Sequence, residues 1–193
     1  MKIIQYQANS IEVIENATNV DGVLIDVRTD QNDIICANGP YESGPKLSEL
    51  AQHIGEKFAV FKIKSDGIEN EIASICQKNK INNYFFLNSS CDARVKMVQN
   101  NQSNFAVRCS DYEPIRGSIS FAGKADWVWL DTYIHSPLTK ENYEIFHKYF
   151  KICAAAPDIY DHSESKMEAF KKQIKTFQVD AICTSKPSEW VTP

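Results

Sequence analysis

The feature that most constrains this chain is a regular alternation of short strand-like runs with segments of helical spacing. Each run is rich in β-branched or aromatic residues, as buried strands are. The eight runs cover residues 2–7, 22–28, 58–64, 83–88, 104–108, 126–131, 150–156 and 179–184. Strands that alternate with helices form parallel sheets, because a parallel connection must cross back along the sheet. The pattern therefore predicts an α/β fold.

The segments between the runs complete a repeating unit. Apolar residues recur at helical spacing in four of them, within residues 47–54, 68–76, 143–149 and 167–177. A helix after residue 184 is missing or reduced to residues 188–190, and residues 33–37 predict the return arm of a hairpin. Eight repeats in 193 residues predict one domain, a minimal (β/α)8 TIM barrel over residues 1–193. A doubly wound open sheet is the alternative, although no Gly-rich phosphate loop follows any of the runs.

Composition excludes several classes of protein. The chain is 43% hydrophobic and carries a formal net charge of −4, which argues against a general binder of nucleic acids or anionic membranes. No stretch approaches the roughly 18 apolar residues that a membrane span needs. The first residues turn polar too early for a signal peptide, so we expect a cytoplasmic protein. The six cysteines include no CxxC pair, so we expect no zinc site. Four of them lie in or beside the strand-like runs, where we expect reduced thiols that fill apolar space: Cys36, Cys109, Cys153 and Cys183.

Charged residues gather at the carboxyl ends of the predicted strands, where a barrel places its active site. Side chains alternate along a strand, so one face of these strands presents Asp26, Arg28, Lys62, Lys64, Asn88 (with Phe86), Arg108 and Asp131. If these faces point inward, four cations and two carboxylates meet at the mouth of the barrel, the open end formed by the carboxyl ends of its strands. Burying unpaired charge costs several kcal/mol per group, so the surplus of cations favours an anionic ligand. In the opposite orientation, the charges would be solvated or paired locally, as Asp26 with Arg28 or Lys64 with Asp66.

Two histidines follow predicted strands on the same side of the barrel. His135 comes four residues after the sixth run, and His162 follows the seventh. Either could act as a general acid or base. A nucleophilic role for Cys109 is disfavoured, because alternation turns it away from the face of Arg108.

Five segments, taken in order, carry a family resemblance. They are DGVLIDVR at residues 21–28, the hairpin at 33–40, PKLSEL at 45–50, FKIK at 61–64 and VDAICTSKP at 179–187. In this order they resemble the glycerophosphodiester phosphodiesterase family, which belongs with the phospholipase-C-like phosphodiesterases. A closer likeness, in residues 62–67, 83–86, 108–113 and 129–131, is to small bacterial members from surface-polysaccharide loci. The resemblance implies a TIM barrel, a phosphorylated small-molecule ligand and a setting in polysaccharide biosynthesis.

The departures from the family pattern concern its catalytic residues. By the resemblance, a metal-binding Glu falls on Leu24, a third acidic ligand on Lys62, and a catalytic His on Asn38. Asn88 and Ser185 stand where further acids are expected, and no His follows the first strand. One carboxylate does not hold Mg²⁺ or Ca²⁺, which need several oxygen ligands. Lys62 is expected at the metal position, paired with Asp26.

These departures lead to three hypotheses. The first is a degenerate phosphodiesterase-like barrel that binds an anionic small molecule without the family's metal-dependent hydrolysis and without a cofactor. The second is an active phosphoric diester hydrolase that uses other residues, such as His135 or His162 with Lys62 and Arg108. The third is a structural or interaction domain whose mouth is closed by internal salt bridges.

Overall fold

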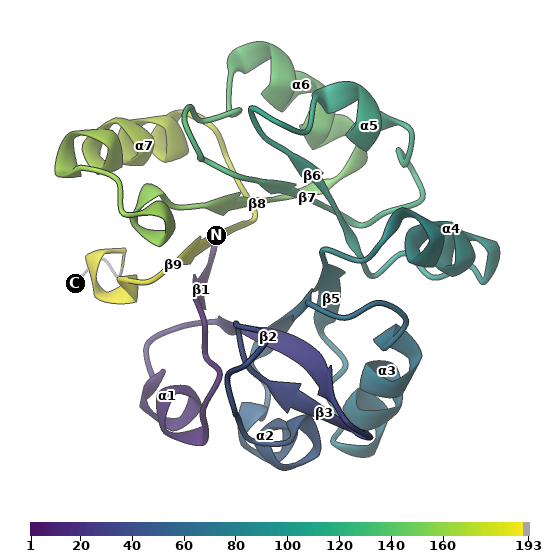
Figure 1. The fold of residues 1–193 in the computed structure, drawn as a ribbon. Coiled ribbons are helices and arrows are strands. Elements are labelled where there is room, and N and C mark those ends of the chain that lie inside the picture. The colour runs from purple at the N-terminus through teal and green to yellow at the C-terminus, as the bar shows by residue number, and fades with distance from the viewer. Residues whose placement is uncertain (191–193) are drawn as a thin grey trace.

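The computed structural model, which describes residues 1–190, is a nearly closed parallel barrel (Figure 1). Eight parallel strands follow one another in the order β5-β4-β2-β1-β9-β8-β7-β6. Their bounds are β1 Lys2–Gln5, β2 Gly22–Asp30, β4 Phe58–Ile63, β5 Tyr84–Leu87, β6 Ala106–Cys109, β7 Trp127–Leu130, β8 Lys151–Ala155 and β9 Ala181–Thr184. At the seam, an isolated bridge between Phe86 and Phe105 links β5 to β6. The TIM barrel prediction is confirmed, and the doubly wound alternative is wrong.

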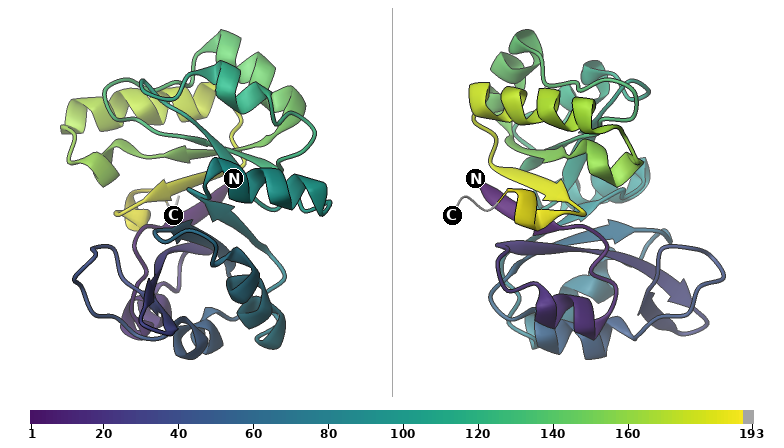
Figure 2. Two further views of the ribbon diagram at one scale, coloured as in Figure 1. Left: turned by 45° about the vertical axis from the view of Figure 1, so that its right-hand side comes forward. Right: turned by 90° about the vertical axis from the view of Figure 1, so that its left-hand side faces the viewer.

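Helices connect the strands and lie outside them (Figure 2). Their bounds are α1 Ile11–Asn16, α2 Leu47–Ile54, α3 Glu69–Lys78, α4 Cys91–Gln99, α5 Ile115–Ile119, α6 Lys140–Tyr149 and α7 Glu164–Thr176. Short 3-10 turns follow β8 (η1, Pro157–Tyr160) and β9 (η2, Pro187–Glu189). The second turn stands where the last helix of a full barrel would be, as the sequence predicts. The hairpin is also confirmed, because β3 (Asp33–Cys36) pairs antiparallel with β2.

The core has two layers, and they fix the direction of the strand side chains. The outer layer packs the strands against the helices and includes Val23, Ile25, Phe61 and Val128 together with helical residues such as Leu50 and Ile72. The inner layer fills the barrel with strand residues, among them Leu24, Val60, Phe85, Ala106, Trp129 and Cys183. Because Leu24 and Val60 face inward, Asp26 and Lys62, two residues further on, lie on the inward face of their strands. The charged faces therefore point to the barrel mouth, and the opposite orientation is wrong.

Strand β5 keeps the alternation of a strand, but in the opposite phase from the prediction. Phe85 and Leu87 pack in the inner layer, and Phe86 packs in the outer layer. The prediction that Phe86 faces inward is therefore wrong. Asn88 still reaches the mouth, because its backbone adopts a left-handed conformation with φ of 67° and breaks the alternation at the end of the strand.

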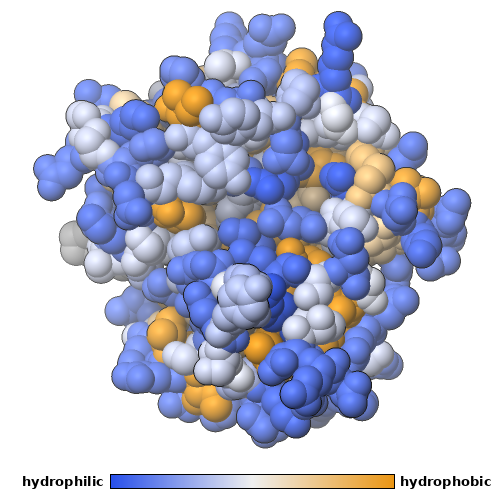
Figure 3. Space-filling view, in the orientation of Figure 1, coloured by the Kyte–Doolittle hydropathy of each residue, from blue (hydrophilic) through white to orange (hydrophobic). Residues whose placement is uncertain are grey.

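The surface in Figure 3 is largely hydrophilic, with apolar residues scattered across it. Within residues 1–190, no helix has both the length and the apolar character needed to cross a membrane. Cys91 is exposed, and the other five cysteines are buried as free thiols, which confirms that they fill apolar space.

Candidate functional site

Asp26 is the fully buried centre of the first of two polar clusters at the mouth. Lys64 Nζ lies 3.1 Å from Asp26 Oδ1. Asn9 Nδ2 donates to Asp26 Oδ2 at 3.0 Å, and the Asp26 backbone N–H donates to Asn9 Oδ1 at 2.8 Å. Lys64 also donates to Asn38 Oδ1 at 2.7 Å. The predicted pairing of Lys62 with Asp26 is therefore wrong, since Lys64 makes that ion pair.

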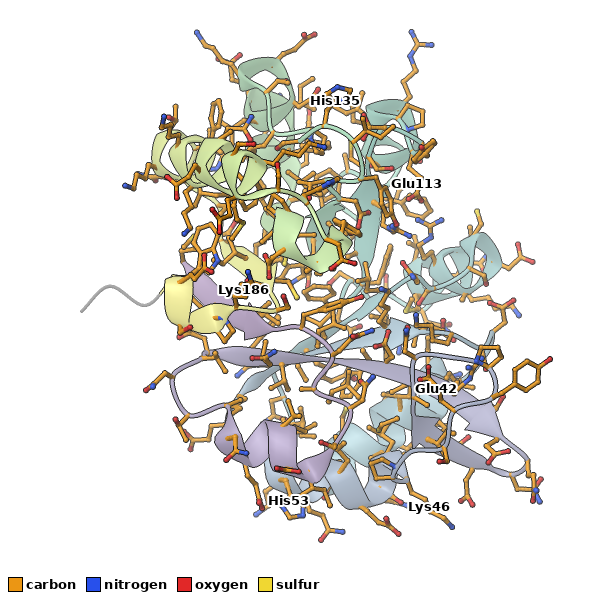
Figure 4. The ribbon with its side chains drawn as sticks, turned by 60° about the vertical axis from the view of Figure 1, so that its left-hand side comes forward. Glu42, Lys46, His53, Glu113, His135 and Lys186 are labelled. Carbon is orange, nitrogen blue, oxygen red and sulfur yellow. The ribbon has the colours of Figure 1, made fainter. Side chains whose placement is uncertain are left out.

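The loop after β3 positions Asn38 for this contact. The Glu42 carboxylate accepts hydrogen bonds from the backbone N–H groups of Asn38 and Gly39 at 3.1 and 2.9 Å. Figure 4 shows Glu42 on this loop. The side-chain oxygen of Asn38 therefore accepts a hydrogen bond from Lys64 and is not free to contact a ligand at the mouth.

Arg108 is the centre of the second cluster. Its Nε and Nη2 atoms donate to Asp131 Oδ2 at 2.9 and 2.7 Å. Nη1 donates to Asn88 Oδ1 at 3.0 Å, and Nη2 also donates to the Tyr133 hydroxyl. The more exposed Glu113, on the loop after β6, lies 3.2 Å from Nε (Figure 4). These contacts fix the guanidinium plane in one orientation.

The second carboxylate oxygen of Asp131, Oδ1, also accepts hydrogen bonds. Trp129 Nε1 donates to Oδ1 at 2.7 Å, and the Tyr160 hydroxyl donates to the same atom. Burial, followed by the charge of Asp131, raises the pKa of Tyr160 well above its usual value. Burial lowers the pKa of Arg108, but the charge and hydrogen bonds of Asp131 outweigh it and raise that pKa. Arg108 therefore stays cationic and Tyr160 stays a donor at neutral pH.

Lys62 and Arg28 are the two cations of the mouth that pair with no carboxylate within 4.0 Å among residues 1–190. Lys62 Nζ lies 5.4 Å from the centre of the Tyr6 ring. Burial, the neighbouring Lys64 and Arg108 lower the pKa of Lys62, although Asp26 and Asp131 oppose the shift. The Nη1 atom of Arg28 is buried without a hydrogen-bond partner in the described chain. Such an atom is costly unless a ligand or water satisfies it.

The two histidines lie beside the mouth clusters. His135 Nδ1 is 2.9 Å from Asp111 Oδ1, and the other oxygen of Asp111 accepts from the backbone N–H groups of Ile134 and His135. The His135 side chain is 81% exposed, which leaves Nε2 to solvent. His162 is engaged at both ring nitrogens, with Nε2 2.8 Å from the Thr132 carbonyl and Nδ1 3.4 Å from Lys166 Nζ.

Asp111 gives a pH-dependent test of the His135 contact. The His135 hydrogen bond, followed by backbone hydrogen bonds, lowers the pKa of Asp111 from 3.8 to about 2. A depressed folded-state pKa stabilises the fold above the unfolded value, and this contribution is lost as pH falls toward 2. We expect an NMR titration of the Asp111 carboxyl to show this low value, and His135→Ala to return it toward 3.8. An unchanged value in His135→Ala would disprove the contact.

The residues of the mouth do not fit a divalent metal. Residues 1–190 contain no group of three His, Cys, Asp or Glu side chains placed to hold one. The oxygens of Asp26 face Lys64 and Asn9, and Lys62 stands opposite Asp26 in the strand register. A cation would meet one occupied carboxylate and two ammonium groups, whereas Mg²⁺ and Ca²⁺ need several oxygen ligands.

Loop residues of the mouth are absent from the sequence predictions. Asn9 binds Asp26, Tyr133 and Glu113 bind Arg108, and Tyr160 binds Asp131. Each lies within a few residues of a strand end, so its position in the sequence could have identified it as a candidate site residue. Their orientations depend on loop backbone, for which strand alternation gives no rule.

The fold and the mouth together define a (β/α)8 barrel whose polar and charged side chains converge at the carboxyl ends of its strands. No protein-family model matches the sequence, and no curated protein sequence matches it. Solved structures do match. A protein of Agrobacterium tumefaciens described as a glycerophosphoryl diester phosphodiesterase has a TM-score of 0.75 at 8% identity, covering 98% of this chain and 95% of that chain.

Two further structures have the same fold. A glycerophosphodiester phosphodiesterase from Agrobacterium tumefaciens has a TM-score of 0.67 at 13% identity, covering 97% of each chain. One from Parabacteroides distasonis has a TM-score of 0.65 at 11% identity, covering 97% of this chain and 94% of that chain. This chain thus has the barrel fold of glycerophosphodiester phosphodiesterases along almost its whole length.

Proposed function

We propose that this protein is a phosphodiesterase-like barrel that binds a phosphorylated or otherwise anionic small molecule without metal-dependent hydrolysis. The observation that carries the proposal is the pair of cations, Lys62 and Arg28, that lie at the mouth without a carboxylate partner in the described chain. Glu113 and Asp158, which is held at the carboxyl end of β9, are further carboxylates at the strand ends. Each is engaged by other groups and neither pairs with Lys62 or Arg28, so an anion would supply the charge that these two cations lack.

The charged groups at the mouth are held in place before any ligand binds, which supports an anionic ligand such as phosphate. Asp131, Asn88 and Tyr133 hold Arg108 rigidly, and the Asp26 cluster holds Lys64. Because the fork of Arg108 is committed to these partners, the arginine that can meet phosphate or carboxylate oxygens is Arg28, and Lys62 contributes a point charge. The prearranged groups lose little conformational entropy when an anion arrives.

The same contacts argue against the family's hydrolysis. By the resemblance, two of the family's metal-binding acids fall on Leu24 and Lys62 and its catalytic His falls on Asn38, which Glu42 and Lys64 engage. The resemblance to members from surface-polysaccharide loci suggests a ligand from polysaccharide biosynthesis, and this setting remains a prediction.

One observation favours hydrolysis by other residues as a second candidate. Asp111 orients His135, and the free Nε2 of that ring is solvent-exposed. A carboxylate that orients an imidazole is an arrangement used for general acid and base catalysis. The engagement of both nitrogens of His162 favours a structural role for that residue.

A phosphodiester assay separates these functions. We expect purified protein to hydrolyse bis(p-nitrophenyl) phosphate no faster than buffer, both with Mg²⁺ or Ca²⁺ and with EDTA, because the mouth offers no metal site. Metal-dependent turnover that disappears in Asp26→Ala would contradict the proposal. Metal-independent turnover that disappears in His135→Ala would establish the second candidate instead.

A further inference from the structure

Lys62 combines partial burial with the absence of a carboxylate partner within 4.0 Å among residues 1–190. The two acids whose charges act on it are occupied by other groups: Asp26 by Lys64 and Asn9, and Asp131 by Arg108, Trp129 and Tyr160. The side chain is half-buried and lies over the Tyr6 ring, so its amine faces the mouth and remains reachable.

The groups that act on Lys62 come from every neighbouring part of the mouth. Lys64 and Arg108 disfavour its protonated form, Asp26 and Asp131 favour that form, and the aromatic wall of Tyr6 lies beside it. Burial raises the pKa of Tyr6 to about 12, so this phenol adds no negative charge at neutral pH. The net effect of these groups and of burial is that the pKa of Lys62 lies below its usual value, and burial is the main cause. A desolvated lysine next to other cations is an activated amine nucleophile.

We propose that Lys62 condenses with the carbonyl carbon of an aldehyde or ketone that also carries a phosphate group, and that Arg28 binds that phosphate. The inference rests on the proposed anion site and names its ligand class. Arg28 lies two residues beyond Asp26 on the same face of β2, and the Cα of Asp26 is the register partner of the Cα of Lys62, so both residues lie toward the carboxyl ends of the neighbouring strands β2 and β4.

Imine formation between Lys62 and the carbonyl group needs no cofactor. The lone pair of Nζ attacks the carbonyl carbon, a C–N bond forms, and the carbonyl π electrons move to oxygen, which takes a proton. The resulting carbinolamine loses its hydroxyl as water when the nitrogen lone pair forms the C=N bond. The net reaction joins one amine and one carbonyl group into an imine and releases one water molecule.

Reductive trapping tests the inference. The protein is incubated with glycolaldehyde phosphate and sodium cyanoborohydride at neutral pH, and peptide mass mapping follows the modification of each lysine. We expect Lys62 to be labelled faster than the exposed Lys124, because burial and the neighbouring cations favour the neutral, nucleophilic amine. Lys62→Met, with its fold verified by circular dichroism, should lose this fast phase and keep the labelling of Lys124.

The controls separate this inference from the anion site. 2-Hydroxyethyl phosphate has no carbonyl group, and we expect it to raise the melting temperature and to slow the labelling of Lys62 but not of Lys124. If it raises the melting temperature and Lys62 reacts no faster than Lys124, the imine inference is wrong and the anion site stands. If it neither raises the melting temperature nor protects Lys62, both the anion site and the ligand class are wrong.

Discussion

Replacing Asp131 by alanine is expected to lower the free energy of unfolding by about 3–5 kcal/mol, the usual cost of removing one partner of a buried ion pair. The carboxylate is buried and accepts from Arg108, Trp129 and Tyr160. The substitution leaves the guanidinium without its main partner and two further donors without an acceptor. Urea denaturation of the two proteins measures the difference.

Glu113→Ala is the matched control, because Glu113 contacts the same guanidinium from a side chain that is 46% exposed. Exposed ion pairs contribute about 0–1 kcal/mol, so we expect a loss in that range. Equal losses in the two variants would show that Asp131 is not the anchor of Arg108.

The double variant Arg28→Met/Lys62→Met is expected to weaken the binding of a simple phosphate ester such as 2-hydroxyethyl phosphate by about 100-fold. A charge pair about 4 Å apart interacts by about 4 kcal/mol near a protein surface. Solvent screening and the retained Arg108 and Lys64 reduce this to about tenfold for each lost cation. Isothermal titration calorimetry in buffer with EDTA measures the affinity.

A second double variant, Lys124→Met/Lys175→Met, changes the net charge equally at two exposed positions that precede the amino ends of β7 and β9, opposite the mouth. We expect its affinity to match that of the wild type. If both double variants weaken binding to the same degree, the effect comes from overall charge and the mouth is not the site.

Strand alternation predicts much of this site from the sequence. The inner layer of the barrel contains Leu24 and Val60, which places Asp26 and Lys62 toward the mouth as predicted. The reason is physical, because successive side chains of a strand point to opposite faces and the barrel interior must be filled. The reduced last helix was also visible in the sequence, since no helical spacing follows residue 184.

Alternation fails where the backbone leaves the strand. Phe86 and Asn88 are two residues apart, yet Phe86 packs in the outer layer and Asn88 reaches Arg108 through a left-handed backbone. The partner of Asp26 likewise depends on a loop, because Glu42 holds the backbone of Asn38, which contacts Lys64. Loop geometry of this kind follows from tertiary contacts, for which the sequence pattern has no periodic signal.

A crystal structure of the protein grown with 2-hydroxyethyl phosphate and EDTA tests the central claim most directly. We expect density for the phosphate at the mouth, within hydrogen-bond distance of Arg28 and Lys62, with the ion pair between Asp26 and Lys64 intact. The same crystals soaked with Ca²⁺ or Mg²⁺ should show no ion at Asp26. A divalent ion bound to Asp26, with Lys64 displaced, or a phosphate bound only outside the mouth, would contradict the account.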